Sequence, residues 1–384
     1  MKYVRKIPLY TTAGVPNCEI STVPFQTEDK LGLSFQRFQQ ANSDDIVVII
    51  HGLTTSTDMF IMPEHYNLVK YLHDHGFPDV WCLDFRMSNR FNYNLAQHSY
   101  TMDDVAKYDY PPALEKLRKI VGQNKRIHVI CHCLGAASFV MSLFAKKVNV
   151  TSCIANSVAL TPRVPRWSKV KLNVAPFIIE KLMNLPYLSP NWGYAPGFSF
   201  TKLLSKIVSA FHRECEVPAC HMLSLMWGTG FPALYKHENL EDITHERGGD
   251  LYGGTSMNYY RHVNKMVQYN STAVKYDPAN ANLADMPNNY FDYASEITTP
   301  VLFMTGRENH IFTDSNIECF NRLEKIVPGR HELVVFDNYG HQDVFMGKNN
   351  HIDIFPKLVE FIEKNKKPLK SIPTRKKLAS KMEV

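Results

Sequence analysis

The stretch from Ile127 to Phe144, IHVICHCLGAASFVMSLF, constrains the fold of this 384-residue chain more than any other. Its first five residues are apolar and partly β-branched, which is typical of a buried parallel strand. Residues 136–144 are small or straight-chain and favour a buried helix. Only Cys-His-Cys-Leu-Gly separates the two, so the sequence predicts a strand that passes through a sharp turn into a helix.

A strand, a tight turn and a helix in this order form the setting of a nucleophile elbow, usually written G-x-S-x-G. Here the nucleophile position falls on Cys133. Cys131 is small enough to pass the neighbouring strand, and Gly135 has no side chain to obstruct the helix. Taking Cys131 as the nucleophile would place Val129 and Cys133 at the flanking positions, which is sterically worse. The alternative interpretation is a buried strand and helix with two structural thiols.

The rest of the chain alternates between strand and helix patterns, which implies βαβ units and a mostly parallel central sheet flanked by helices. The opening pair, 19–26 and 31–39, is expected to be antiparallel. Further strands are expected at 45–50, 79–85, 151–160, 299–306 and 332–336, and helices at 62–75, 112–121, 315–326 and 352–364.

Residues 161–295 break this rhythm with helical patterns, aromatic residues and proline-rich turns, so we expect a helical cap inserted into an α/β fold. The cap could form an apolar acyl-binding wall, or its aromatic residues could fill its own core. The predicted organisation is an N-terminal segment at 1–18, a core at 19–160 and 296–365, the cap at 161–295, and a basic tail at 366–384.

Two further loops complete the expected site. The strand ending at Ile50 runs into His51-Gly52-Leu53, where this architecture provides the second backbone N–H of an oxyanion hole; Leu134, after the nucleophile, provides the first. His341 lies in a loop after the last strand, the position of the catalytic base. Asn309 follows the strand at 299–306, where an acid is usual, and Glu308 and Asp314 are rival third members.

Cys133 and Asn309 form a chemically consistent pair. A serine loses its proton during attack, so replacing the carboxylate of a serine triad by an amide costs about 10⁴-fold. A cysteine can instead rest as a thiolate beside an imidazolium, and a neutral amide then suffices. The sequence therefore predicts attack of Cys133 on an ester or thioester carbonyl, with His341 as base and then acid and Asn309 orienting its imidazole.

The span from about residue 20 to 365 resembles the α/β-hydrolase superfamily. More narrowly, the segments HCLGA, MWGTGFPALYKHENL, GGDLYGGTSMNYYRH and GHQDVFMGKN resemble hydrolase-like domains associated with bacterial cholesterol-oxidase-type (GMC) oxidoreductases. The resemblance implies an ester or thioester hydrolase acting on a lipid or sterol-like substrate. The chain has no G-x-G-x-x-G unit or room for a flavin domain, so no cofactor is expected. At the elbow alone it resembles dienelactone hydrolases and polyhydroxyalkanoate synthases, so acyl transfer and a catalytically silent binding protein stay open.

Charge and cysteine usage narrow the expected partners. Residues 364–384 hold eight basic residues and one acidic residue, and the remainder holds 35 basic and 36 acidic ones, so the tail carries the net charge of +6. The tail is expected to be solvated, with contact to an anionic membrane surface as the alternative; nothing in the body indicates nucleic-acid binding.

Without C-x-x-C pairs among the eight cysteines, no metal site is expected. A signal peptide and a spanning segment are not apparent, so a cytoplasmic location with free thiols is expected.

Overall fold

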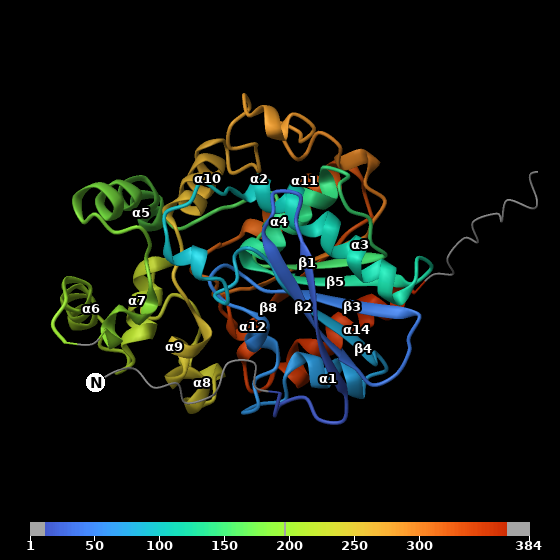
Figure 1. The fold of residues 1–384 in the computed structure, drawn as a ribbon, viewed down its shortest axis with the longest axis horizontal. Helices are drawn as coiled ribbons and strands as arrows, with labels where there is room; N and C mark the ends of the chain where they lie inside the picture. Colours follow the sequence, from blue (N-terminus) through green and yellow to red (C-terminus); the bar gives the residue numbers. More distant parts are fainter. Residues whose placement is uncertain (1–11, 196, 367–384) are drawn as a thin grey trace, which may run out of the picture.

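An eight-stranded sheet organises the computed structural model, which describes residues 12–195 and 197–366 (Figure 1). The strands are β1 (Glu19–Gln26), β2 (Gly32–Gln39), β3 (Asp45–Ile50), β4 (Asp79–Asp84), β5 (Arg126–His132), β6 (Ser152–Asn156), β7 (Val301–Gly306) and β8 (Glu332–Phe336). Their order is β1-β2-β4-β3-β5-β6-β7-β8, and only the pairs that include β2 are antiparallel. The predicted parallel sheet with an antiparallel opening pair is confirmed.

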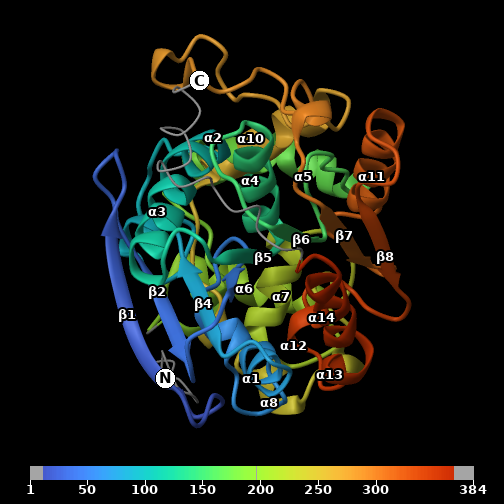
Figure 2. The same ribbon diagram turned by 90° about the vertical axis from the view of Figure 1, so that its right-hand side faces the viewer.

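Helices cover both faces of the sheet (Figure 2). One face carries α1 (Leu68–Asp74), α12 (Asp343–Met346), α13 (Asn350–Asp353) and α14 (Phe355–Lys364), and the other carries α2 (Met102–Asp104), α3 (Tyr110–Val121), α4 (Cys133–Phe144) and α11 (Ser315–Ile326). The central strands β3, β4, β6 and β7 are buried along their whole length. This burial on both faces explains why they are continuous apolar runs and do not alternate.

The two largest differences between predicted and observed element boundaries lie at the helix expected at 62–75 and the strand expected at 151–160. The helix expected at 62–75 begins only at Leu68, because the Asn67 side chain caps it by accepting the Lys70 N–H at 2.9 Å. The strand expected at 151–160 ends at Asn156, because Ser157 adopts a φ of +75° and turns the chain out of the sheet.

The cap helices lie to one side of the sheet (Figure 1). They are α5 (Arg166–Phe177), α6 (Phe200–Phe211), α7 (Pro218–Met226), α8 (Asp242–Glu246), α9 (Gly248–Leu251) and α10 (Met257–Gln268). The cap has a small apolar cluster of its own, formed by Ile179, Leu188, Trp192, Val208, Met222, Met226, Met257 and Tyr260. Many cap aromatic and methionine side chains therefore fill the cap itself.

The end of the predicted cap, after α10, packs on the core. Tyr290 is buried there and donates its hydroxyl to Asp103 at 2.6 Å, and Ala273, Val274 and Met286 belong to the main apolar core. The domain boundaries stay a prediction. Apart from Lys366, the basic tail lies outside the described residues, and in the described part of the chain no helix is both apolar and long enough to span a membrane.

Candidate active site

The turn between β5 and α4 has the geometry of an elbow. His132 is extended, with φ −127° and ψ 142°, and Cys133 follows with a φ of +55°. A positive φ at a residue with a side chain costs of the order of 1–3 kcal/mol, so the surroundings must hold it. Gly135 lets the elbow pack tightly against its surroundings, because a Cβ at this position would lie only 2.0 Å from the carbonyl oxygen of His51. Helix α4 thus packs directly on the end of β3.

The loop after β3 also packs closely against the elbow, at Cys133 itself. A Cβ on Gly52 would lie 2.9 Å from the Cβ of Cys133, so only glycine lets the two turns meet. The backbone N–H groups of Leu134 and Leu53 point to the Cys133 thiol and partly oppose the effect of burial, which raises its pKa to about 12. The structure thus brings together the two N–H groups expected to form an oxyanion hole and the expected nucleophile.

His341 lies in the loop between β8 and α12 and completes a compact group. One ring nitrogen each of His132 and His341 and the sulfur of Cys133 all lie within 4.8 Å of one another. Burial, and after it the neighbouring His132, hold the pKa of His341 well below its usual value of 6.5. The directions of these shifts favour a neutral thiol and a neutral imidazole. They oppose the resting thiolate–imidazolium pair expected from the sequence.

Asn309 is buried, and its side chain holds the turn that follows β7. Its Oδ1 accepts the backbone N–H groups of Ile311 and Phe312, each at 3.0 Å, and its Nδ2 donates to Thr305 at 3.3 Å. The Phe312 ring packs against the His341 ring at a centroid distance of 6.0 Å. Among the described residues, the Nδ1 atom of His341 has no hydrogen-bond partner. Asn309 thus touches the site through Phe312, and its role toward the imidazole stays a prediction.

The two rival acids are engaged elsewhere. Glu308 accepts from Lys236 at 3.2 Å, and Asp314 pairs with Arg163 at 2.8 Å. In each of these two ion pairs the carboxylate is more exposed to solvent than its basic partner. As arranged here, neither supports His341.

The sequence analysis did not single out two groups that lie beside Cys133 and His341, His132 and Asp343. His132 lies under the elbow with its ring centroid 4.8 Å from that of His341; its Nε2 donates to Gln342 Oε1 and its Nδ1 accepts from Asn156, both at 2.7 Å. Asp343 accepts the N–H of Gly340 with both carboxylate oxygens, at 2.9 and 3.0 Å. Burial raises the pKa of its carboxyl to about 6. For Asp343, the signal was the polar run GHQD that contains His341.

An apolar cavity of about 190 Å³ adjoins this group from the cap side. Leu134 and Phe312 form its wall toward the elbow and His341. The cap provides most of the remaining lining, which includes Leu172, Ala175, Ile179, Met226, Trp227, Tyr260 and Val263. The main polar exception, Lys171, donates its Nζ to the carbonyl oxygens of Leu225 and Gly228, at 2.9 and 2.5 Å. The cavity can therefore hold an apolar group against Leu134, which follows Cys133, and Phe312, whose ring packs on His341.

Comparison with solved structures identifies proteins of the same architecture. The chain is similar to a thermostable carboxyl esterase from Bacillus coagulans (12% identity, TM-score 0.54, covering 90% of this chain and 98% of that one). It is similar also to a thermophilic esterase from Thermogutta terrifontis (13%, 0.51, 90% and 99%) and to a lipase in an open form (13%, 0.52, 90% and 99%). At these identities the likeness concerns the fold alone. No curated protein sequence matches the chain significantly.

The family described as alpha/beta hydrolase fold matches residues 45–347, from the first central strand to the end of the His341 loop. The match includes the elbow, the loop after β3, the cap and the loop after β8. The fold predicted from the elbow is therefore confirmed, and the narrower resemblance to the oxidoreductase-associated domains stays a prediction. Because the matched span makes up most of its length, the chain belongs to the alpha/beta hydrolase fold family.

Proposed function

We propose that the protein is a hydrolase that cleaves an ester or thioester through an acyl intermediate on Cys133. The observation that carries this proposal is the strained elbow cysteine, which faces two backbone N–H groups and lies beside His341. The Cys133 sulfur attacks the carbonyl carbon while His341 takes the thiol proton. The N–H groups of Leu134 and Leu53 stabilise the oxyanion that forms.

The intermediate then collapses, and the bond to the leaving alkoxide or thiolate breaks as that group takes the proton from His341. His341 next removes a proton from water, whose oxygen attacks the acyl carbon and releases the carboxylic acid. The departing thiolate of Cys133 recovers the proton from His341, so the enzyme ends as it began. In this reaction scheme, His341 is protonated only transiently within each step, in agreement with its low pKa.

The cavity indicates the kind of acyl group. An apolar cavity of about 150 Å³ is large enough to bind benzene, whereas sites for drug-sized ligands measure about 300–1,000 Å³. The volume of about 190 Å³ therefore fits a short acyl chain or one ring, with the rest of the substrate outside. The likeness of the cap and His341 segments to the oxidoreductase-associated domains supports a lipid-like or sterol-derived ester, whose bulky part would lie beyond the cavity.

Acyl transfer is the second candidate, and one observation favours it. His341 is only 1% exposed, and Leu134 and Phe312 beside the catalytic group line an apolar cavity, so bulk water has restricted access to the proposed base. An added alcohol or thiol acceptor distinguishes the two reactions: ester or thioester products at the expense of free acid would favour transfer.

The test of the proposed function is to trap the intermediate. Aryl esters of increasing chain length are mixed with the protein, the reaction is stopped with acid, and peptides are analysed by mass spectrometry. We expect the acyl mass on the Cys133 peptide, sensitive to hydroxylamine. Cys133→Ala should abolish turnover, and Cys319→Ala, which alters a buried thiol on α11, should not. No adduct and no turnover across the series would identify a silent binding protein.

A further inference from the structure

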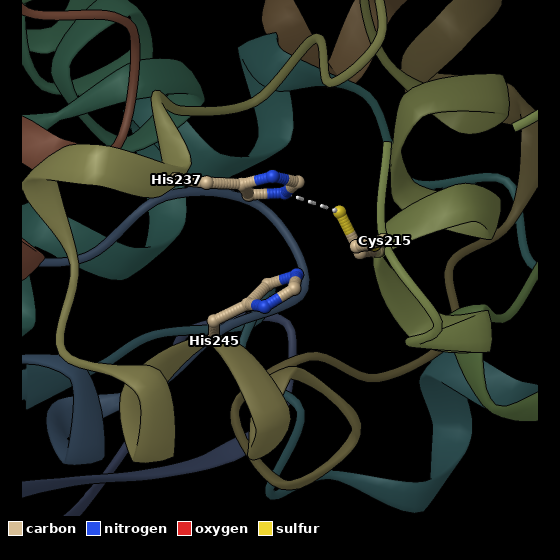
Figure 3. A group of neighbouring side chains, drawn as sticks. Cys215, His237 and His245 are labelled. Atoms are coloured by element: carbon tan, nitrogen blue, oxygen red, sulfur yellow. Dashed lines mark hydrogen bonds between the residues drawn. The ribbon is translucent and has the colours of Figure 1, made fainter. Parts of the chain in front are cut away.

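A second group of thiols and imidazoles lies in the cap, apart from the proposed nucleophile. It consists of Cys215, Cys220, His237 and His245. Figure 3 shows the rings of His237 and His245 directed toward the sulfur of Cys215. Cys215 precedes α7, Cys220 lies within it, His237 begins a short 3₁₀ turn, and His245 lies on α8. Three separate segments of the cap therefore meet at these four side chains.

The spacing of the ligand atoms matches a tetrahedral metal site. One atom of each side chain lies within 4.8 Å of all the others, and the sulfur of Cys220 is 3.4 Å from the Nε2 atom of His237. In a tetrahedral zinc site with Zn–S near 2.3 Å and Zn–N near 2.1 Å, sulfur and nitrogen are about 3.6 Å apart. Small side-chain adjustments would bring all four atoms to that geometry.

The surroundings leave these ligands available. Among the described residues, the Nε2 atom of His245 is buried without a hydrogen-bond partner. His221 borders the group: its Nε2 lies 3.3 Å from the Cys215 sulfur and 2.9 Å from the Cys215 carbonyl oxygen, and its Nδ1 bonds Ser209 Oγ at 2.9 Å. It supports the Cys215 loop from outside the group.

We propose that Cys215, Cys220, His237 and His245 form a structural Zn²⁺ site in the cap. Two thiolates and two imidazoles are a ligand set typical of closed zinc sites, and four protein ligands leave no position for substrate. Binding releases the thiol protons and leaves the metal and its ligands without net charge. This neutrality suits a group in which Cys220 is only 1% exposed.

The site would also fix the segment that holds the His341 loop. The carbonyl oxygen of Leu234 accepts the N–H of Gln342 at 3.0 Å. Asn239 donates its Nδ2 to Asp343 at 2.6 Å. His237 lies between these two contacts in the sequence. A metal bound there therefore ties the base of the cap to the loop that carries the proposed catalytic histidine.

The experiment measures metal in the full chain, purified without a histidine tag and without added metal. Elemental analysis should find about one zinc per chain. Cys220→Ser and His237→Asn should each lower the content to below about a fifth of the wild-type value, because a site that loses a ligand binds far more weakly. Cys319→Ser is the matched control, since it removes a buried thiol elsewhere and should retain the zinc.

A second measurement uses only the wild-type protein, so the proposal can be tested even if the variants do not fold. Zinc in the wild-type protein is replaced by Co²⁺, which should give the intense visible bands and the thiolate-to-metal charge-transfer absorption of a tetrahedral S₂N₂ site. Three results would overturn the proposal: a zinc-free protein without a cobalt spectrum, equal loss of zinc in Cys319→Ser, or a Cys215–Cys220 disulfide detected by peptide mapping.

Discussion

The sheet edge and the cap place reactive side chains by different means. At the sheet edge, strands that are buried along their length end at fixed points, and two glycines let the turns after β3 and β5 touch. In the cap, short helices share a small apolar cluster, and four polar side chains from three segments meet where the cap packs on the main core, to which Cys220 belongs. The comparison teaches that backbone contact fixes the proposed nucleophile, whereas side chains, with a proposed metal, hold the base of the cap against the loop that carries His341.

The largest effect should come from the backbone contact at the elbow. In Gly135→Ala, the new Cβ would lie 2.0 Å from the carbonyl oxygen of His51, so α4 must move away from β3. We expect a loss of more than about 3 kcal/mol in the free energy of unfolding, and loss of activity, measured by denaturant titration and esterase assay. Gly32→Ala, where an added Cβ meets nothing within 4 Å, is the control and should change stability little. Equal effects would contradict the role of backbone contact.

The protonation of the core site provides the second test. Because burial raises the pKa of Cys133 to about 12, the thiolate fraction should increase with pH throughout the neutral range. Alkylation by iodoacetamide should therefore accelerate about a hundredfold between pH 7 and 9, as expected for a thiol titrating above that range. Peptide mapping follows Cys133 alone. A rate that is already constant below pH 7 would instead indicate the thiolate–imidazolium pair.

A change in the cap should alter selectivity and leave the chemistry intact. Ala175 lines the cavity, so Ala175→Phe should shorten it and lower kcat/KM for the longest accepted acyl chain by about tenfold, equivalent to ~1.4 kcal/mol. Acetyl esters should react at the wild-type rate. Val174→Phe, on the neighbouring solvent-exposed position, is the matched control. Equal losses for all chain lengths would place the cavity outside the substrate path.

The role of Asn309 can be measured with a double-mutant cycle. Cys133→Ser should lower kcat/KM strongly, because a hydroxyl must lose its proton to an unsupported His341. If Asn309 can reach the imidazole, adding Asn309→Asp should restore about fivefold, or ~1 kcal/mol. The aspartate retains the oxygen that accepts the two turn N–H groups. Strict additivity would restrict Asn309 to holding the turn.

The smallest effect should come from the basic tail. Its charge and prolines motivate the prediction that catalysis does not require it. Deleting residues 367–384 should leave kcat/KM on a water-soluble ester within about twofold, under roughly 0.5 kcal/mol. A large loss of kcat/KM with an unchanged melting temperature would show that the tail, besides the core and the cap, contributes to the site.

Most of the core followed from local sequence, and the cap did not. The run DIVVII has high strand propensity and is buried throughout, and the turn at Gly135 needs a residue without a side chain. Both features are visible in a few adjacent residues, so these structures are predictable. The protonation of Cys133 depends on burial by distant segments, and the elbow motif alone had favoured a thiolate. The cap cluster was missed because its ligands span positions 215 to 245 without the C-x-x-C spacing that marks local metal sites.

Leu134 has a consequence for how such a protein can diversify. Its backbone N–H faces the Cys133 thiol, while its side chain lines the apolar cavity. Under the proposed mechanism, one residue therefore serves both the speed of the reaction and the choice of acyl group. A substitution there alters the cavity wall at the residue that also holds an oxyanion N–H, whereas substitutions on α5 or α10 alter the wall alone. New substrate ranges should accordingly arise by drift in the cap helices, with the elbow left unaltered.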